Sequence, residues 1–183
     1  MRRSTGSMGD FTVARNYDFR NLRVLVVDDS QFMIRVVSNI LEALGVGSVF
    51  SATSGRDGFE TACRYSPDIV ISDWDMDGGE GPELVSLLRN DPSSPDPYVN
   101  VIMLTGYAEM RRVIAARDFG ITEFLSKPVS AKALHARLVA LVERPRPFVR
   151  VGRDYFGPDR RRAANESYSG AERRAPEDFA DLG

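Results

Sequence analysis

The amino-acid sequence predicts an α/β fold, in which a parallel sheet is covered by helices on both faces. Two observations lead to this prediction. Short apolar runs bounded by turn residues alternate five times with segments whose apolar residues recur at helical spacing. In addition, Asp28, Asp73, Thr105 and Lys127 follow four of these runs, at the edge where open parallel sheets place their chemistry. The runs are residues 24–27, 49–52, 69–71, 101–104 and 123–126.

The composition of the chain favours a cytosolic protein. Of its 183 residues 43% are apolar, which is enough for a core, and no apolar run approaches the ~20 residues that span a membrane. The single cysteine, Cys63, excludes an internal disulfide, as is usual in the cytosol. Arg2 and Arg3 precede no apolar stretch, so a secretory signal is not expected. The net charge of -2 gives no whole-chain argument for nucleic-acid binding.

The helices are predicted from their caps and from the spacing of apolar residues. Serine residues that can cap a helix precede three of them: Ser30, Ser54 and Ser130. Gly45 suits the end of the first helix, and Pro82 suits the first turn of the third. The segment 108–119 has a less regular apolar face and completes a set of five helices.

The residues that follow the predicted strands form the candidate site. Asp28 and Asp29 follow the first run, Asp73 the third, Thr105 the fourth and Lys127 the fifth. Because the carboxyl ends of parallel strands share one edge, these side chains should be neighbours. Clustered carboxylates repel one another unless a cation joins them, and hard oxygen ligands suit Mg²⁺. A carboxylate beside a metal can be a nucleophile toward phosphorus, and a lysine and a hydroxyl can stabilise the transferred group.

These residues, in this order, resemble the receiver domain of bacterial response regulators, the CheY-like family. The matching motifs are Asp28-Asp29, Asp73-Trp74-Asp75-Met76, Gly81, Thr105-Gly106 and Lys127-Pro128. The resemblance covers residues 21–144. It implies a flavodoxin-like, doubly wound sheet of five parallel strands in the order 2-1-3-4-5, with five helices.

The resemblance also implies a phosphoryl acceptor and a metal cofactor. Asp73 would accept phosphate from a histidine kinase or a histidine phosphotransfer protein. Mg²⁺ would be held by Asp28, Asp29 and Asp73 and by the backbone carbonyl of Asp75. The family usually has proline where Asp77 stands, so Asp75 and Asp77 add charges to this turn that bear on the lifetime of the phosphate.

The remaining matched residues would form a switch. Lys127 would bind an oxygen of the phosphoryl group, and the Lys127–Pro128 peptide bond would be cis. Thr105 would move toward the phosphoryl group, and Phe124, at the family's aromatic switch position, would fill the space behind it. A downstream protein would then be contacted through the face of residues 108–143 or through the tail.

Two other interpretations of the motif from Asp73 to Gly78 fit the chain less well. A calcium EF-hand loop needs a bidentate glutamate where Leu84 stands, and two flanking helices in place of a strand. A phosphatase of the haloacid-dehalogenase type has its nucleophile on the first strand and its acidic pair on the last, which is the opposite order.

The two ends of the chain lie outside the resemblance. Residues 1–20 are predicted to be a flexible arm, and residues 145–183 a disordered tail with too few apolar residues to fold alone. A chain that ends at Arg144 should therefore keep its stability. The tail mixes arginines with aromatic residues, a pattern that can bind single-stranded nucleic acid or dock on an acidic protein. Acidic residues offset most of this charge, so nucleic acid is not the expected partner.

The sequence thus favours a stand-alone response regulator of a two-component phosphorelay, which signals by protein contact in the cytoplasm. It is not expected to be an enzyme beyond its own Mg²⁺-dependent phosphorylation and dephosphorylation, because no effector domain is visible after residue 143. Two alternatives stay open. One is a receiver-switched, nucleic-acid-binding regulator that acts through the basic tail, and the other is a receiver that serves as a phosphate sink or scaffold.

Overall fold

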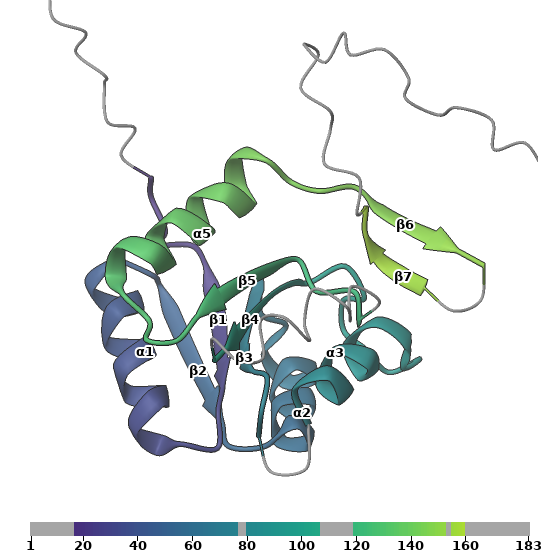
Figure 1. Cartoon of the computed structure of the whole chain (residues 1–183), viewed down its shortest axis with the longest axis horizontal. Helices are drawn as coiled ribbons and strands as arrows, with labels where there is room; N and C mark the ends of the chain where they lie inside the picture. Colours follow the sequence, from purple (N-terminus) through teal and green to yellow (C-terminus); the bar gives the residue numbers. More distant parts are fainter. Residues whose placement is uncertain (1–16, 77–79, 107–118, 153–154, 160–183) are drawn as a thin grey trace, which may run out of the picture.

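A five-stranded parallel sheet forms the middle of the molecule (Figure 1). The computed structural model describes residues 17–76, 80–106, 119–152 and 155–159. All pairings in this sheet are parallel, and the strand order is β2-β1-β3-β4-β5. The predicted flavodoxin-like topology is therefore confirmed. The strands are β1 (Arg23–Val27), β2 (Ser48–Ala52), β3 (Ile69–Asp73), β4 (Asn100–Thr105) and β5 (Glu123–Ser126).

Four helices of the described residues cover the two faces of the sheet. One face carries α1 (Gln31–Ala43) and α5 (Ala131–Glu143), and the other carries α2 (Gly55–Tyr65) and α3 (Glu80–Asn90) (Figure 1). The helix predicted for residues 108–119 lies outside the described part of the chain, except for its last residue. Within that part, no helix is both long and apolar enough to cross a membrane.

The helix caps follow the predictions from the sequence. The hydroxyl oxygen of each predicted capping serine accepts a hydrogen bond from a backbone N–H three residues later, as found for Ser30, Ser54 and Ser130. Each bond satisfies a donor that the helix itself leaves without a partner. Gly45 follows the last residues of α1 with a φ of 83°, a left-handed conformation that favours glycine.

Both faces of the sheet are buried, because successive residues of a strand point to opposite sides. In β1, Val24 and Val26 pack beneath α1 and α5, while Leu25 and Val27 pack beneath α2 and α3. The helices contribute regularly spaced apolar residues to these two cores. They include Ile34, Val37, Leu41, Leu134 and Leu138 on the first face, and Ala62, Leu84, Val85 and Leu88 on the second.

The predicted arm of residues 1–20 ends earlier than expected. Phe19 is buried in the core of the α1 and α5 face, and the Tyr17 hydroxyl donates a hydrogen bond to Glu143 at the end of α5. The two rings also contact His135, with centroid distances of 6.4 Å for Tyr17 and 5.8 Å for Phe19. Residues 17–20 therefore belong to the folded domain, because their aromatic rings cover apolar surface that α5 provides.

The prediction that residues 145–183 form a disordered tail is wrong for residues 145–159. Strands β6 (Phe148–Val151) and β7 (Tyr155–Pro158) form an antiparallel hairpin that lies beside α3 (Figure 1). The rings of Phe148 and Phe156 contact Tyr98, in the loop after α3, at centroid distances of 5.3 and 5.2 Å. Tyr155 is buried, and its hydroxyl donates to the carbonyl of Pro158 at 2.7 Å. The folded domain thus continues beyond α5.

Removal of the hairpin is expected to destabilise the domain, contrary to the expectation from the sequence. A chain ending at Arg144 loses the aromatic contacts to Tyr98, whereas a chain ending at Asp159 keeps them. A loss of about 2–3 kcal/mol is usual for such packing, and at about 2–4 °C per kcal/mol the shorter chain should melt about 5–10 °C lower. Thermal unfolding followed by circular dichroism measures the difference. Equal melting temperatures would place the domain boundary at Arg144 again.

Candidate functional site

Three carboxylates gather at the carboxyl ends of the neighbouring strands β1 and β3. Asp28 and Asp29 follow β1, and Asp73 is the last residue of β3. One carboxylate oxygen from each residue lies within 4.8 Å of the others. Asp28 and Asp73 are buried, whereas Asp29 is exposed. The cluster predicted from the strand ends is therefore present, and solvent reaches it from the side of Asp29.

Lys127 completes this cluster from the far side of β4. Its Nζ lies 2.8 Å from Oδ1 of Asp73 and 3.3 Å from Oδ2 of Asp28. Burial by itself lowers the pKa of Lys127, but the hydrogen bond and charge of Asp73, with a smaller contribution from Asp28, raise the pKa above its ordinary value. The side chain is thus a cation at neutral pH. The Lys127–Pro128 peptide bond is cis, as the resemblance implied.

The charge of the Asp28 carboxylate is only partly accommodated by its surroundings. Burial raises the pKa of this carboxyl, and the charge of Asp73 adds to the effect. The backbone N–H of Ser30, at 2.9 Å, and the ammonium of Lys127 offset only part of it. A carboxylate in this situation favours an additional cation. Oxygen ligands from three carboxylates, close together and open on one side, fit a small hard ion such as Mg²⁺.

Thr105 and Phe124 lie on neighbouring strands close to this cluster. Thr105 ends β4 and is buried, and its hydroxyl donates to the carbonyl of Gly106 at 3.2 Å. In the register of β4 and β5, Thr105 is opposite Ser126, so Phe124 is two residues away on the same face of the sheet. The ring of Phe124 is half-buried against the core beneath α2 and α3. The two residues are therefore placed so that a movement of one side chain changes the space open to the other.

Gly81 allows the start of α3 to approach the end of β3. A Cβ atom at this position would lie 2.3 Å from the carbonyl oxygen of Asp73 and 2.7 Å from that of Trp74. The neighbouring Glu80, which no motif in the sequence points to, accepts a hydrogen bond from the backbone N–H of Gly55 at 2.7 Å. This bond joins the starts of α2 and α3. Asp75 is exposed directly after the site, and the predicted charge at Asp77 lies outside the described residues.

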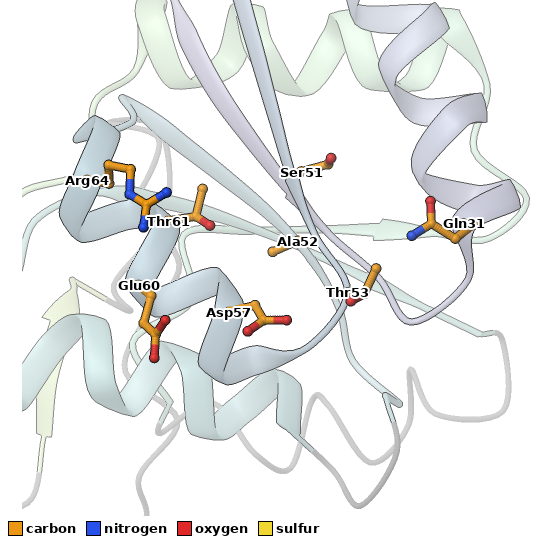
Figure 2. Close-up of a pocket in the computed structure, with 8 residues that line it drawn as sticks. All are labelled: Gln31, Ser51, Ala52, Thr53, Asp57, Glu60, Thr61 and Arg64. Atoms are coloured by element: carbon orange, nitrogen blue, oxygen red, sulfur yellow. The ribbon is translucent and has the colours of Figure 1, made fainter.

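A separate depression of about 390 Å³ lies beside β2 and α2. Asp57, Glu60 and Arg64 of α2 line it, together with Gln31 from the start of α1 (Figure 2). None of the clustered carboxylates lines this depression. The chemistry of the strand ends therefore does not take place there.

The topology and the acidic cluster with its lysine together define a receiver domain. Residues 24–139 match the family model of the response regulator receiver domain, so the chain belongs to that family. The chemotaxis protein CheY-3 of Vibrio cholerae is 30% identical over 125 residues, which are 68% of this chain and 95% of that protein. The chemotaxis protein CheY of Pseudomonas aeruginosa is 28% identical over 123 residues, which are 67% of this chain and 98% of that protein.

Solved structures agree with this assignment. A response regulator receiver domain protein from Clostridium thermocellum superimposes with a TM-score of 0.59 at 28% identity, over 67% of this chain and 95% of that one. The chemotaxis protein CheY4 of Vibrio cholerae gives 0.58 at 29% identity, over 64% of this chain and 96% of that one. About two thirds of this chain align with nearly the whole length of these relatives. The family model matches residues 24–139, so the hairpin after residue 144 lies outside the matched part.

Replacement of Asp28 should stabilise the protein in the absence of divalent cations. Because the pKa of this carboxyl is raised on folding, its charge opposes folding above the folded pKa, and this penalty disappears as the pH falls below the unfolded pKa. Asp28→Asn should therefore raise the free energy of unfolding at pH 7 by about 1 kcal/mol, the usual size of a single-site effect. The gain over the wild type should shrink as the pH is lowered toward 4.

Urea unfolding at a series of pH values, in buffer with a chelator, measures this difference. Glu60→Gln is a suitable control, since Glu60 belongs to an exposed pair with Arg56 and should change the stability by less than about 0.5 kcal/mol. A lower stability of Asp28→Asn at pH 7 would show that Lys127 and Ser30 outweigh the cost of burying this charge.

Proposed function

We propose that the chain is a phosphoacceptor response regulator of a two-component phosphorelay and that Asp73 carries the phosphoryl group. The contact between Asp73 and Lys127, at 2.8 Å and beside an acidic pair, is the observation that supports this assignment most. Asp73 ends a strand buried on both faces, so its carboxylate is held in one place. The partners that would supply the phosphoryl group are a histidine kinase or a histidine phosphotransfer protein.

In this proposal a carboxylate oxygen of Asp73 attacks the phosphorus of a phosphohistidine. The bond between phosphorus and the imidazole nitrogen breaks, and its electron pair returns to the imidazole, which takes a proton from water. Lys127 stabilises the negative charge of the phosphoryl oxygens, and the hydroxyl of Thr105 donates a further hydrogen bond. Removal of the phosphoryl group by water restores the carboxylate, so no separate effector enzyme is proposed.

The acidic pair would serve to bind Mg²⁺ at this site. Asp28, Asp29 and Asp73 would be its side-chain ligands, with the backbone carbonyl of Asp75 beside them. When bound, the ion offsets the mutual repulsion of the carboxylates and of the phosphoryl oxygens. This role accounts for a buried carboxylate at Asp28 whose charge the protein alone accommodates only in part.

The output is proposed to be a protein contact in the cytoplasm. Thr105 and Phe124 would couple the phosphoryl group to the face of residues 108–143, of which residues 119–143 are described. Stacking of the aromatic rings of residues 145–159 on nucleic-acid bases is less favoured than the sequence suggested, because the rings of Phe148 and Phe156 already contact Tyr98. Arg150 likewise lies over the ring of Phe156, at 4.7 Å from its centroid.

Acetyl phosphate with Mg²⁺ should phosphorylate the protein on Asp73. Mass spectrometry of the intact protein and of its peptides measures the amount and the position of the label. We expect Asp73→Asn to lose the label. Asp75→Asn, two positions further along the chain and with an exposed side chain, should keep it. Labelling of Asp73→Asn at the wild-type level would contradict the proposed acceptor.

Binding of Mg²⁺ should depend on side chains of the cluster and not on the Asp75 side chain. Trp74 follows Asp73 directly, so its fluorescence should change on titration with Mg²⁺ in the millimolar to sub-millimolar range. We expect Asp29→Asn and Asp73→Asn to weaken binding by about tenfold or more, and Asp75→Asn to leave it nearly unchanged, because only its carbonyl is required. Isothermal titration calorimetry provides an independent measurement. If the wild type and the three variants bound Mg²⁺ with equal affinity, this set of ligands would be excluded.

A further inference from the structure

Arg89 of α3 forms the centre of the surface on which the hairpin rests. Its side chain is buried, and the guanidinium donates to three backbone carbonyls: Gly120 at 3.0 Å, Pro97 at 2.9 Å and Val99 at 2.7 Å. Burial lowers its pKa to about 10, so it stays a cation at neutral pH. The ring of Phe148 lies over the guanidinium, at 5.0 Å from its centroid. Arg89 thus connects α3, the loop after it, the segment before β5 and the hairpin.

The hairpin contacts the segment of residues 119–122 directly. A Cβ atom on Gly157 would lie 2.5 Å from the Cα of Gly120, and one on Gly120 would lie 2.8 Å from the carbonyl oxygen of Phe156. Gly120 also has a φ of 74°, which suits glycine. Arg146 donates to the carbonyl of Thr122 at 3.3 Å. Residues 119–122 are therefore held in one conformation by the docked hairpin.

The other side of the same segment contacts the phosphorylation site. The ring of Phe119 packs edge-on against Trp74, the residue after Asp73, at a centroid distance of 5.8 Å. Thr122 pairs with Val101 of β4 through its backbone N–H and its side-chain oxygen, both at 3.0 Å. Two residues further along the chain stands Phe124. Residues 119–122 thus lie between the acceptor site and the hairpin.

We propose that residues 145–159 are an intramolecular partner of the 119–122 segment, and that their docking competes with the phosphoryl group on Asp73. The proposal rests on the proposed phosphorylation of Asp73. In this structure the hairpin is docked on the 119–122 segment, and Lys127 is held against the carboxylates of Asp73 and Asp28. A phosphoryl group draws Lys127 and Thr105 toward its oxygens, and the segment that leads into β5 must adjust with them. A docked hairpin opposes this adjustment.

This competition has to be reciprocal. If the docked hairpin weakens the binding of a phosphoryl group by some factor, the phosphoryl group weakens the docking of the hairpin by the same factor. Loosening the hairpin by mutation should therefore strengthen binding at a site that the mutated residue does not touch.

Beryllofluoride with Mg²⁺, a mimic of the phosphoryl group, tests the proposal on the full chain. Gly157→Ala places a Cβ against Gly120 and should undock the hairpin, whereas Val151→Ala, at an exposed hairpin position, should not. From Trp74 fluorescence we expect beryllofluoride to bind Gly157→Ala about 5- to 10-fold more tightly than the wild type, within the usual range of coupling between two sites. Val151→Ala should bind like the wild type.

Two further measurements make the outcome decisive. Phe156→Ala removes the ring contact with Tyr98 without adding a clash, and should shift the affinity in the same direction as Gly157→Ala. Hydrogen exchange of the wild-type amides in residues 148–158 should become faster when beryllofluoride is added. Equal affinities in all variants, or unchanged exchange, would overturn the coupling alone. No binding of beryllofluoride to the wild type would overturn the proposed function as well.

Discussion

The pairing of Lys127 with Asp73 and Asp28 is the interaction on which the arrangement of the site depends. Without a cation between them, the carboxylates at the ends of β1 and β3 would repel one another in a partly buried position. Lys127 directly follows β5, and it is 99 positions from Asp28 in the chain. The parallel register places it correctly, since its backbone N–H donates to the carbonyl of Thr105 at 2.9 Å. The chemistry of this edge therefore requires β1, β3, β4 and β5 to be in place.

The position of β5 depends in turn on the segment that precedes it. Residues 119–122 are packed against Trp74 on one side and against Arg89 and the hairpin on the other. A buried backbone carbonyl without a donor costs about 1–3 kcal/mol, and Arg89 satisfies three of them at once. Arg89 thereby holds the loop before β4 and the segment before β5 against α3, and its contact with the ring of Phe148 joins the hairpin to the same structural unit.

The domain also extends beyond the part that matches its family. Residues 24–139 carry the match, while Phe19 before it and the hairpin after it add packing on opposite faces of the sheet. Phe19 and Tyr17 cover α5 near His135, and the hairpin covers α3 near Tyr98. These additions give the chain surfaces that lie outside the part matched by the family model. The hairpin is the addition that contacts Gly120, next to the residue that packs against Trp74.

The five strands, the capping serines and the residue types at the strand ends could be predicted from the sequence alone. These features are local, because a strand run, a cap such as Ser30 or a residue that follows a strand can be read within a few positions. The class of the fold and the members of the acidic cluster followed from them, since parallel strands bring their carboxyl ends to one edge.

The end of the domain and the contacts that hold β5 in position could be recognised only in the folded structure. The segments that form β6 and β7 contain Arg150, Gly157 and Pro158, so they do not show the pattern of a strand. Their stability comes from a surface built by residues distant in sequence. Likewise, nothing within the sequence of α3 distinguishes Arg89 from an exposed arginine. Its burial depends on carbonyl groups that two other segments supply, the loop before β4 and the segment before β5, and those segments meet around Arg89 only in the folded chain.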